Sequence, residues 1–150
     1  MELERYNPRK DREALIELVS AFDYRAFKPI ILDNFTKELD TRVKDLKMRN
    51  SIVLAKEGEN LLGAGFFTVF VNHFGETQCQ VHQVVTRKEN SFRKGIEEQI
   101  MRELFKYIKS TMGINQIFLF CDKSDNNFKS LLMKMGIKKS PLEYYEHTLD

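Results

Sequence analysis

The sequence contains no tryptophan and little proline, glycine or cysteine, with three, seven and two residues among 150. This scarcity excludes a collagen-like or low-complexity chain, and 42% hydrophobic residues predict a packed core. Cys79 and Cys121 lie in strand-like runs without the paired spacing of a zinc or redox site. We interpret both as buried free thiols, keep a disulfide as the alternative, and expect no metal site.

A strong charge of either sign and a long apolar run are also missing. Lysine plus arginine number 24 and aspartate plus glutamate 22, a balance that gives no reason to expect a nucleic-acid partner. No apolar stretch approaches the ~20 residues that cross a bilayer. Residues 1–4 lack the basic and then apolar order of a signal peptide. We expect no membrane partner, a cytoplasmic location, and a single domain over residues 1–150.

The first half of the chain predicts two helices followed by an antiparallel meander. Asn7 and Pro8 are typical of a helix start, and apolar residues then recur at helical spacing. Gly75 lies in a hairpin loop at 72–76. The patterns predict strands at 2–6, 51–56, 61–71 and 77–86, and helices at 8–22 and 31–46. Alternation along the meander places Phe66 and Phe70 on one face and Phe67 on the other.

The second half returns to the helical period. A long amphipathic helix is predicted at 96–112 and ends at Gly113. Residues 117–121 are wholly apolar, which is typical of a buried parallel strand. A last helix at 128–135 ends at Gly136, and 142–149 is expected to close the sheet. The pattern as a whole predicts an α+β (mixed α/β) fold on one sheet.

Two segments are candidates for ligand binding. The first is Val84-Val85-Thr86, then a polar loop and Phe92-Arg93-Lys94-Gly95-Ile96-Glu97, and the second runs from Asp125-Asn126-Asn127-Phe128 to Lys134-Met135-Gly136-Ile137. With the element order, they resemble the GNAT superfamily of acetyl-coenzyme A-dependent N-acetyltransferases over nearly the whole chain. The resemblance implies a three-layer fold with a mixed, mostly antiparallel sheet of six to seven strands and about four helices.

The start of the helix at 96 can hold a phosphate on physical grounds. A helix N-terminus offers unpaired N–H groups and a partial positive charge, which suit a pyrophosphate. Gly95 would let the backbone approach closely. The alternative is an ordinary solvated helix start. The resemblance implies that acetyl-coenzyme A, as co-substrate, is bound by Val84, Val85, Thr86, Arg93, Lys94, Gly95, Ile96, Glu97 and Asn127.

The sequence departs from the family pattern at several positions. Phe92 replaces a glutamine or arginine, Glu97 replaces a glycine or alanine, and Leu132 replaces the tyrosine that protonates the leaving thiolate. A carboxylate at position 97 disfavours a pyrophosphate unless it points away. Coenzyme A thiolate still leaves without an acid, because thiol pKa values lie near ~8.5.

The resemblance implies direct acetyl transfer to a primary amine in a ternary complex, with a backbone N–H near Val85 stabilising the oxyanion. No carboxylate stands in the strand at 79–85, so His82, with an ordinary pKa near neutrality, is the candidate catalytic base. The alternative is a structural strand histidine. The acceptor is expected to be a small-molecule or peptide amine, and a homodimer stays open. Two other functions remain: a GNAT-fold coenzyme A-binding or regulatory domain without turnover, and an unrelated α+β interaction module.

Overall fold

The computed structural model describes residues 1–24 and 28–150, and within these ranges it shows an α+β fold on one five-stranded sheet. The strands are β1 (Glu2–Arg5), β2 (Ile52–Glu57), β3 (Asn60–Val71), β4 (Thr77–Val81) and β5 (Val85–Thr86). The α-helices are α1 (Pro8–Ala21), α2 (Leu32–Arg42), α3 (Ile96–Ser110) and α4 (Asn126–Lys134). Short 3-10 turns, η1 (Phe22–Tyr24) and η2 (Lys88–Asn90), follow α1 and β5.

The long strand β3 organises the sheet. The strand order is β1-β2-β3-β4, and β5 also pairs with β3, so β4 and β5 share one edge of that strand. All these pairings are antiparallel. The predicted single strand at 77–86 is therefore two strands, with residues 82–84 between them.

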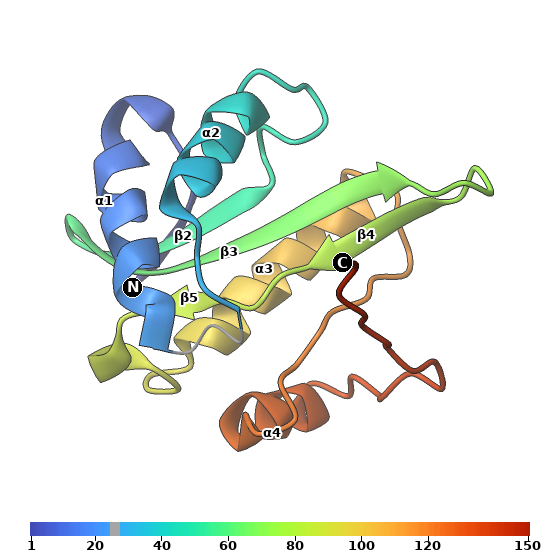
Figure 1. Cartoon of the computed structure of the whole chain (residues 1–150). Helices are drawn as coiled ribbons and strands as arrows, with labels where there is room; N and C mark the ends of the chain where they lie inside the picture. Colours follow the sequence, from blue (N-terminus) through green and yellow to red (C-terminus); the bar gives the residue numbers. More distant parts are fainter. Residues whose placement is uncertain (25–27) are drawn as a thin grey trace.

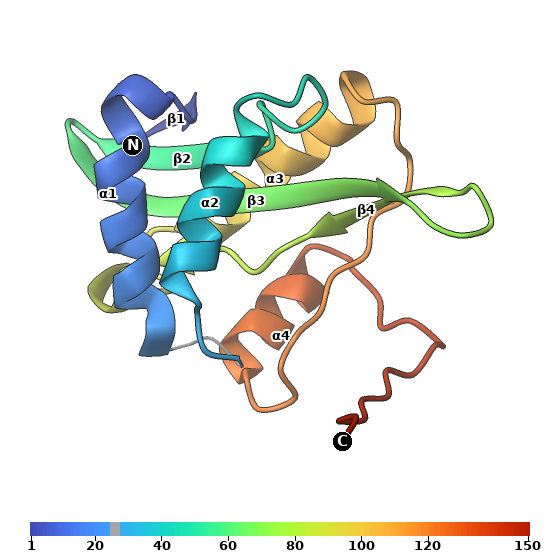
Figure 2. The same cartoon turned by 45° about the horizontal axis from the view of Figure 1, so that its top comes forward.

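Helices cover both faces of the sheet, which gives three layers (Figure 1). Because side chains alternate along a strand, Ile52 and Leu54 pack with the core under α1 and α2, whereas Val53 and Ala55 pack with the core under α3. Figure 2 shows α1 and α2 side by side on one face. The expected alternation of Phe66 and Phe67 between the two cores is confirmed, while Phe70 is partly exposed and Phe74 lies 75% exposed in the hairpin.

The start of α1 follows the predicted cap. The Asn7 side chain accepts a hydrogen bond from the N–H of Arg9, and Pro8 is the first helical residue. The buried Asp11 carboxylate accepts from the N–H of Asn7 and lies 2.6 Å from Nζ of Lys56 on β2. This ion pair fixes the helix to the sheet.

The sequence prediction is wrong for two strands near the C-terminal end. Residues 117–121 make one parallel bridge, Gln80 with Phe118, and residues 142–149 form no strand. The segment after Ile137 is exposed throughout. Tyr144 contacts Phe120, and Glu146 pairs with Lys28. The described sheet therefore has fewer strands than the six to seven expected.

Smaller differences concern the second helix and the thiols. The helix predicted at 31–46 ends at Arg42, and Leu46 is 81% exposed in the following turns, where the Asp45 side chain accepts from two backbone N–H groups. Both cysteines are free as predicted, but only Cys79 is buried, and Cys121 is partly exposed. Within the described residues no helix is long and apolar enough to cross a membrane.

Gly65 is a close-packing position where β3 crosses α3. A methyl group there would lie 2.3 Å from Cγ2 of Ile100 and 2.9 Å from Cδ1 of Leu104. We expect Gly65→Ala to lower the free energy of unfolding by about 1–3 kcal/mol in denaturant titrations, because such overpacking strains a core. Ile100→Ala removes the nearest atom, so the double variant should lose less than the sum of the single losses. Additive losses would contradict the contact.

Candidate functional site

The predicted phosphate-binding loop leads into α3 as expected. Gly95 precedes the helix with φ +65°, a left-handed conformation that suits glycine. Phe92 and Lys94 also have positive φ values, 56° and 57°, which are uncommon for residues with a side chain. Arg93, Lys94 and Gly95 are exposed, so the loop presents its basic side chains and its backbone to solvent.

Glu97 fills the inside of this loop. Its side chain is buried, with 2% exposure, and its Oε2 accepts a hydrogen bond from the N–H of Phe92 at 2.7 Å. A carboxylate in the first turn also interacts favourably with the helix dipole. The Glu97 side chain therefore points into the loop that the sequence assigns to a pyrophosphate.

The strand end at 84–86 adjoins the start of α3. Val84, Val85 and Thr86 are buried, and a methyl group placed on Gly63 would lie 3.0 Å from the carbonyl oxygen of Val85 and 3.1 Å from Cγ2 of Ile96. The structure thus brings together the two parts of the first predicted segment. Asn127 belongs to a different element, where it is exposed on the first turn of α4.

The stretch between β4 and β5 contains one residue more than the part of β3 that it faces. Phe67 pairs with Val81 and Ala64 pairs with Val85, so three steps along β3 face four steps along the other side. Such a bulge bends a strand and re-aims its side chains, and bulges are frequent beside active sites. His82 and Gln83 lie in the bulged stretch, and both line a pocket on the α1–α2 face of the sheet.

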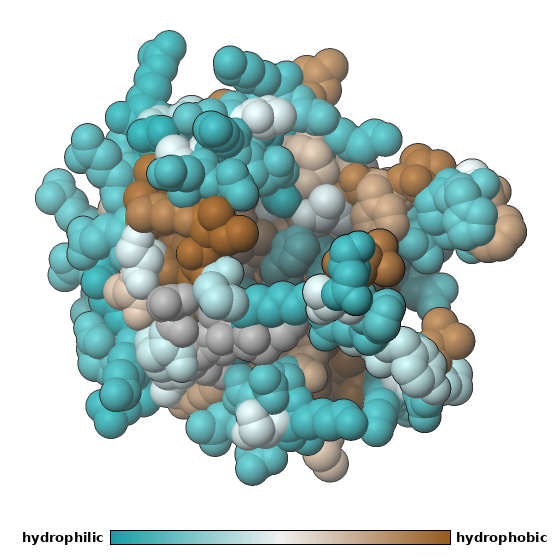
Figure 3. Space-filling view, in the orientation of Figure 1, coloured by the Kyte–Doolittle hydropathy of each residue, from teal (hydrophilic) through white to brown (hydrophobic). Residues whose placement is uncertain are grey.

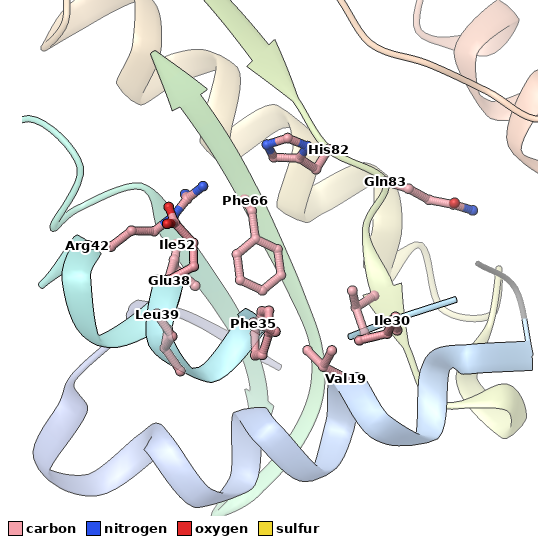
Figure 4. A pocket seen from close by; sticks show the side chains of 11 residues that line it. Val19, Ile30, Phe35, Glu38, Leu39, Arg42, Ile52, Phe66, His82 and Gln83 are labelled. Atoms are coloured by element: carbon pink, nitrogen blue, oxygen red, sulfur yellow. The ribbon is translucent and has the colours of Figure 1, made fainter. Parts of the chain in front are cut away.

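The pocket has a cavity volume of about 240 Å³ and opens between the two helices and the sheet (Figure 4). Most of its lining is apolar, and four of the lining residues are polar. The apolar residues are Val19, Ile30, Phe35, Leu39, Ile52, Phe66 and Val85, and the polar residues are Glu38, Arg42, His82 and Gln83. In the space-filling view, hydrophobic surface gathers beside a hollow at the start of α2 (Figure 3).

His82 is held by a buried charge network. Its Nε2 lies 2.7 Å from Oγ1 of Thr68, which also accepts a hydrogen bond from Nη2 of Arg42 at 2.7 Å. Nη1 of Arg42 donates to Oγ of Ser51 and to the carbonyl of Phe67. The Arg42 guanidinium is thus fixed beside the imidazole by groups from β3 and the turn before β2.

This network changes the acid–base chemistry expected of His82. Burial, and then the positive charge of Arg42, lower its pKa from 6.5 to about 4. The imidazole is therefore neutral across the physiological range, and the sequence expectation of a pKa near neutrality is wrong. Arg42 and Thr68 were not predicted as site residues, since an arginine at a helix end and a threonine in a strand carry no local signal that they meet a histidine.

The two other histidines of the chain lie on other segments. His73 is exposed in the hairpin and His147 in the C-terminal segment. Gln83 connects the bulge to α4, because its Nε2 donates to Oδ2 of Asp125, the residue that caps this helix. Among the described residues, no group of three or more histidine, cysteine, aspartate or glutamate side chains could hold a metal ion.

The fold is that of known acetyltransferases. A possible acetyltransferase from Clostridium difficile 630 aligns with TM-score 0.77 and 14% identity over 99% of this chain and 97% of its own. The ribosomal-protein-alanine N-acetyltransferase of Brucella melitensis biovar Abortus 2308 aligns with TM-score 0.71 and 16% identity over 99% of this chain and 100% of its own. A chain of the NatC complex, bound to Gag peptide and coenzyme A, aligns with TM-score 0.69 and 9% identity over 90% of this chain and 84% of its own. The sequence matches no protein-family model and no curated protein.

These alignments confirm the GNAT-like fold. At such low identities they show the shared fold, and they leave the activity to be argued from this chain's own residues.

The lowered pKa of His82 makes stability depend on pH. As pH falls below 6.5 the unfolded chain takes up the proton first, so folding is weakened until the folded pKa of about 4 is passed. We expect a loss of about 2 kcal/mol in the free energy of unfolding between pH 7 and pH 5 from this group alone.

Denaturant titrations of the wild type and of His82→Gln at both pH values measure that loss. His147→Gln, in the exposed C-terminal segment, is the matched control and should keep the wild-type pH dependence. Equal pH dependence in the wild type and in His82→Gln would show that His82 titrates normally.

Proposed function

We propose that the chain is an N-acetyltransferase that moves an acetyl group from acetyl-coenzyme A to a primary amine bound in the α1–α2 pocket. One observation carries the proposal: the β4–β5 bulge lies between this pocket and the junction of β5 with α3, so donor and acceptor sites meet at residues 82–85. The resemblance to GNAT enzymes and the coenzyme A of the NatC structure support this choice of donor.

The donor site consists of the β5 end and the loop before α3. The exposed Arg93 and Lys94 supply positive charge, and Gly95 allows close approach of the backbone. A pyrophosphate bound at this loop competes with the Glu97 side chain for the N–H of Phe92, because both accept from one donor. Coenzyme binding therefore requires the Glu97 side chain to leave the loop or to share it.

In the reaction, the amine nitrogen attacks the thioester carbonyl, the new C–N bond forms, and the C–S bond breaks to release the thiolate. The amine proton passes to a neutral acceptor and then to solvent. His82 is the candidate acceptor. In this proposal its Nδ1 faces the substrate and takes the proton, which requires the tautomer in which Nε2–H donates to Oγ1 of Thr68. A backbone N–H near Val85 stabilises the oxyanion, an interaction typically worth about 3–4 kcal/mol.

A second candidate is a coenzyme A-binding or regulatory domain without turnover. The buried Glu97 favours it, since this carboxylate opposes phosphate binding, and the tyrosine that serves the family as general acid is replaced by Leu132. Binding of acetyl-coenzyme A without thioester consumption over a broad amine panel would select this candidate.

Two substitutions in the loop should change the affinity for acetyl-coenzyme A in opposite directions, and together they test the donor site. Gly95→Glu adds a carboxylate at a left-handed position and should weaken acetyl-coenzyme A binding. Glu97→Ala removes the competing anion and should tighten binding about tenfold, with Glu97→Gln between it and the wild type. Calorimetry on the three variants measures both effects. Absence of binding by the wild type and by Glu97→Ala at millimolar ligand would reject the donor site.

The role of His82 is tested by the pH profile of turnover. Because its pKa is about 4, the wild-type rate should show no histidine inflection between pH 5 and pH 8. His82→Ala should lower the rate at least about tenfold at every pH in that range, as measured by thiol release. A wild-type inflection near pH 6–7, or an unchanged rate in His82→Ala, would exclude this role.

A further inference from the structure

The lining of the α1–α2 pocket indicates which kind of amine it can bind. Phe35 and Phe66 meet edge to face, with ring centroids 6.0 Å apart, and form one wall. Val19 and Leu39 are buried beside them, and Ile30 is partly buried at the entrance. Of the polar lining residues, Arg42 and His82 are both engaged with the hydroxyl of Thr68.

From this arrangement we infer that the acceptor is a monoamine carrying one apolar group, aliphatic or aromatic, with the group buried between α1 and α2 and the amine beside His82. The inference deepens the proposed function and rests on it for the reaction, but binding of such an amine depends on the pocket alone.

The size of the pocket suits one ring or a short branched chain. A cavity of about 150 Å³ is known to hold benzene, and the volume here is about 240 Å³. Each buried methylene contributes about fourfold to affinity when it leaves water. A hydroxyl or a second ammonium placed against the apolar wall of Val19, Phe35 and Phe66 finds no partner there and is disfavoured.

Charge in the pocket favours the reactive form of the amine. The Arg42 guanidinium, 9% exposed, repels a neighbouring ammonium and so favours the neutral amine, as it favours the neutral imidazole of His82. Glu38 lies at the pocket rim, where its Oε1 is 3.2 Å from Nε of Arg42. An amine with a single charge to lose is the acceptor that this site accommodates most easily.

Ile30 and Ile31 give a matched pair for the test. Ile30 lines the pocket, whereas Ile31 is 64% exposed next to it and does not line it. Asparagine at position 30 places a polar amide on the apolar wall. Asparagine at position 31 makes the same replacement outside the wall, at the N-cap of α2, where asparagine is a favoured residue.

The experiment measures binding of phenethylamine, ethanolamine and spermidine to the full chain by calorimetry, together with acetylation of each amine. Phenethylamine should bind at least about tenfold more tightly than the other two. Ile30→Asn should weaken its binding about tenfold, and Ile31→Asn should not change it.

The outcomes separate the two proposals. Selective phenethylamine binding that depends on Ile30 supports the inference even if no acetylation occurs. The lack of acetylation would then count against the proposed function. Acetylation of ethanolamine or spermidine in preference to phenethylamine overturns the inference and leaves the transferase proposal standing. If phenethylamine is neither bound nor acetylated, the inference is overturned. Equal effects of the two asparagine variants would show that the pocket is not the binding site.

Discussion

The buried charge of Arg42 is the constraint on which this side of the molecule depends. A guanidinium taken out of water must be matched by acceptors, since an unmatched buried charge is very costly. Here the acceptors come from Glu38 on its own helix, from Ser51 before β2, and from Phe67 and Thr68 on β3. The end of α2 is therefore fixed over the middle of the sheet, and this fixed helix forms one side of the pocket. Burial, and then the same positive charge, lower the pKa of His82 and keep its imidazole neutral.

The bulge opposite β3 supplies the second constraint. A strand that kept regular register from Val81 onward would place Val84 opposite Ala64, and the extra residue moves Val85 there instead. One additional residue reverses the face of every side chain that follows. His82 and Gln83 stand in the transition, which is why residues from one short segment reach both the pocket and, through Asp125, the start of α4. The donor and acceptor sites of the proposed reaction meet where the sheet is irregular.

The sequence predicts the parts of this fold that depend on local pattern. The cap at Asn7, the three-strand meander and the long helix from Ile96 are signalled by cap chemistry or by hydrophobic period, and the structure confirms them. The sequence does not reveal that residues 142–149 stay outside the sheet, because strand pairing at a sheet edge is decided by partners distant in the sequence. The site divides in the same way. Gly95 is recognisable from its place before a helix, whereas the contacts of His82 with Thr68, and of Thr68 with Arg42, join residues 14 and 26 positions apart.

Glu97 shows how one interaction can stabilise the fold and oppose the proposed activity. Three residues of the loop, Phe92, Lys94 and Gly95, have left-handed backbone conformations, and those with side chains each carry a cost. The hydrogen bond from Phe92 to a buried carboxylate helps to offset that cost when no ligand is bound. The helix dipole favours any anion at this place, whether a side chain or a phosphate. In the proposed function, the affinity for a coenzyme would be set by the difference in free energy between these two occupants of one site. Donor binding would then depend more on position 97 than on the count of basic residues in the loop.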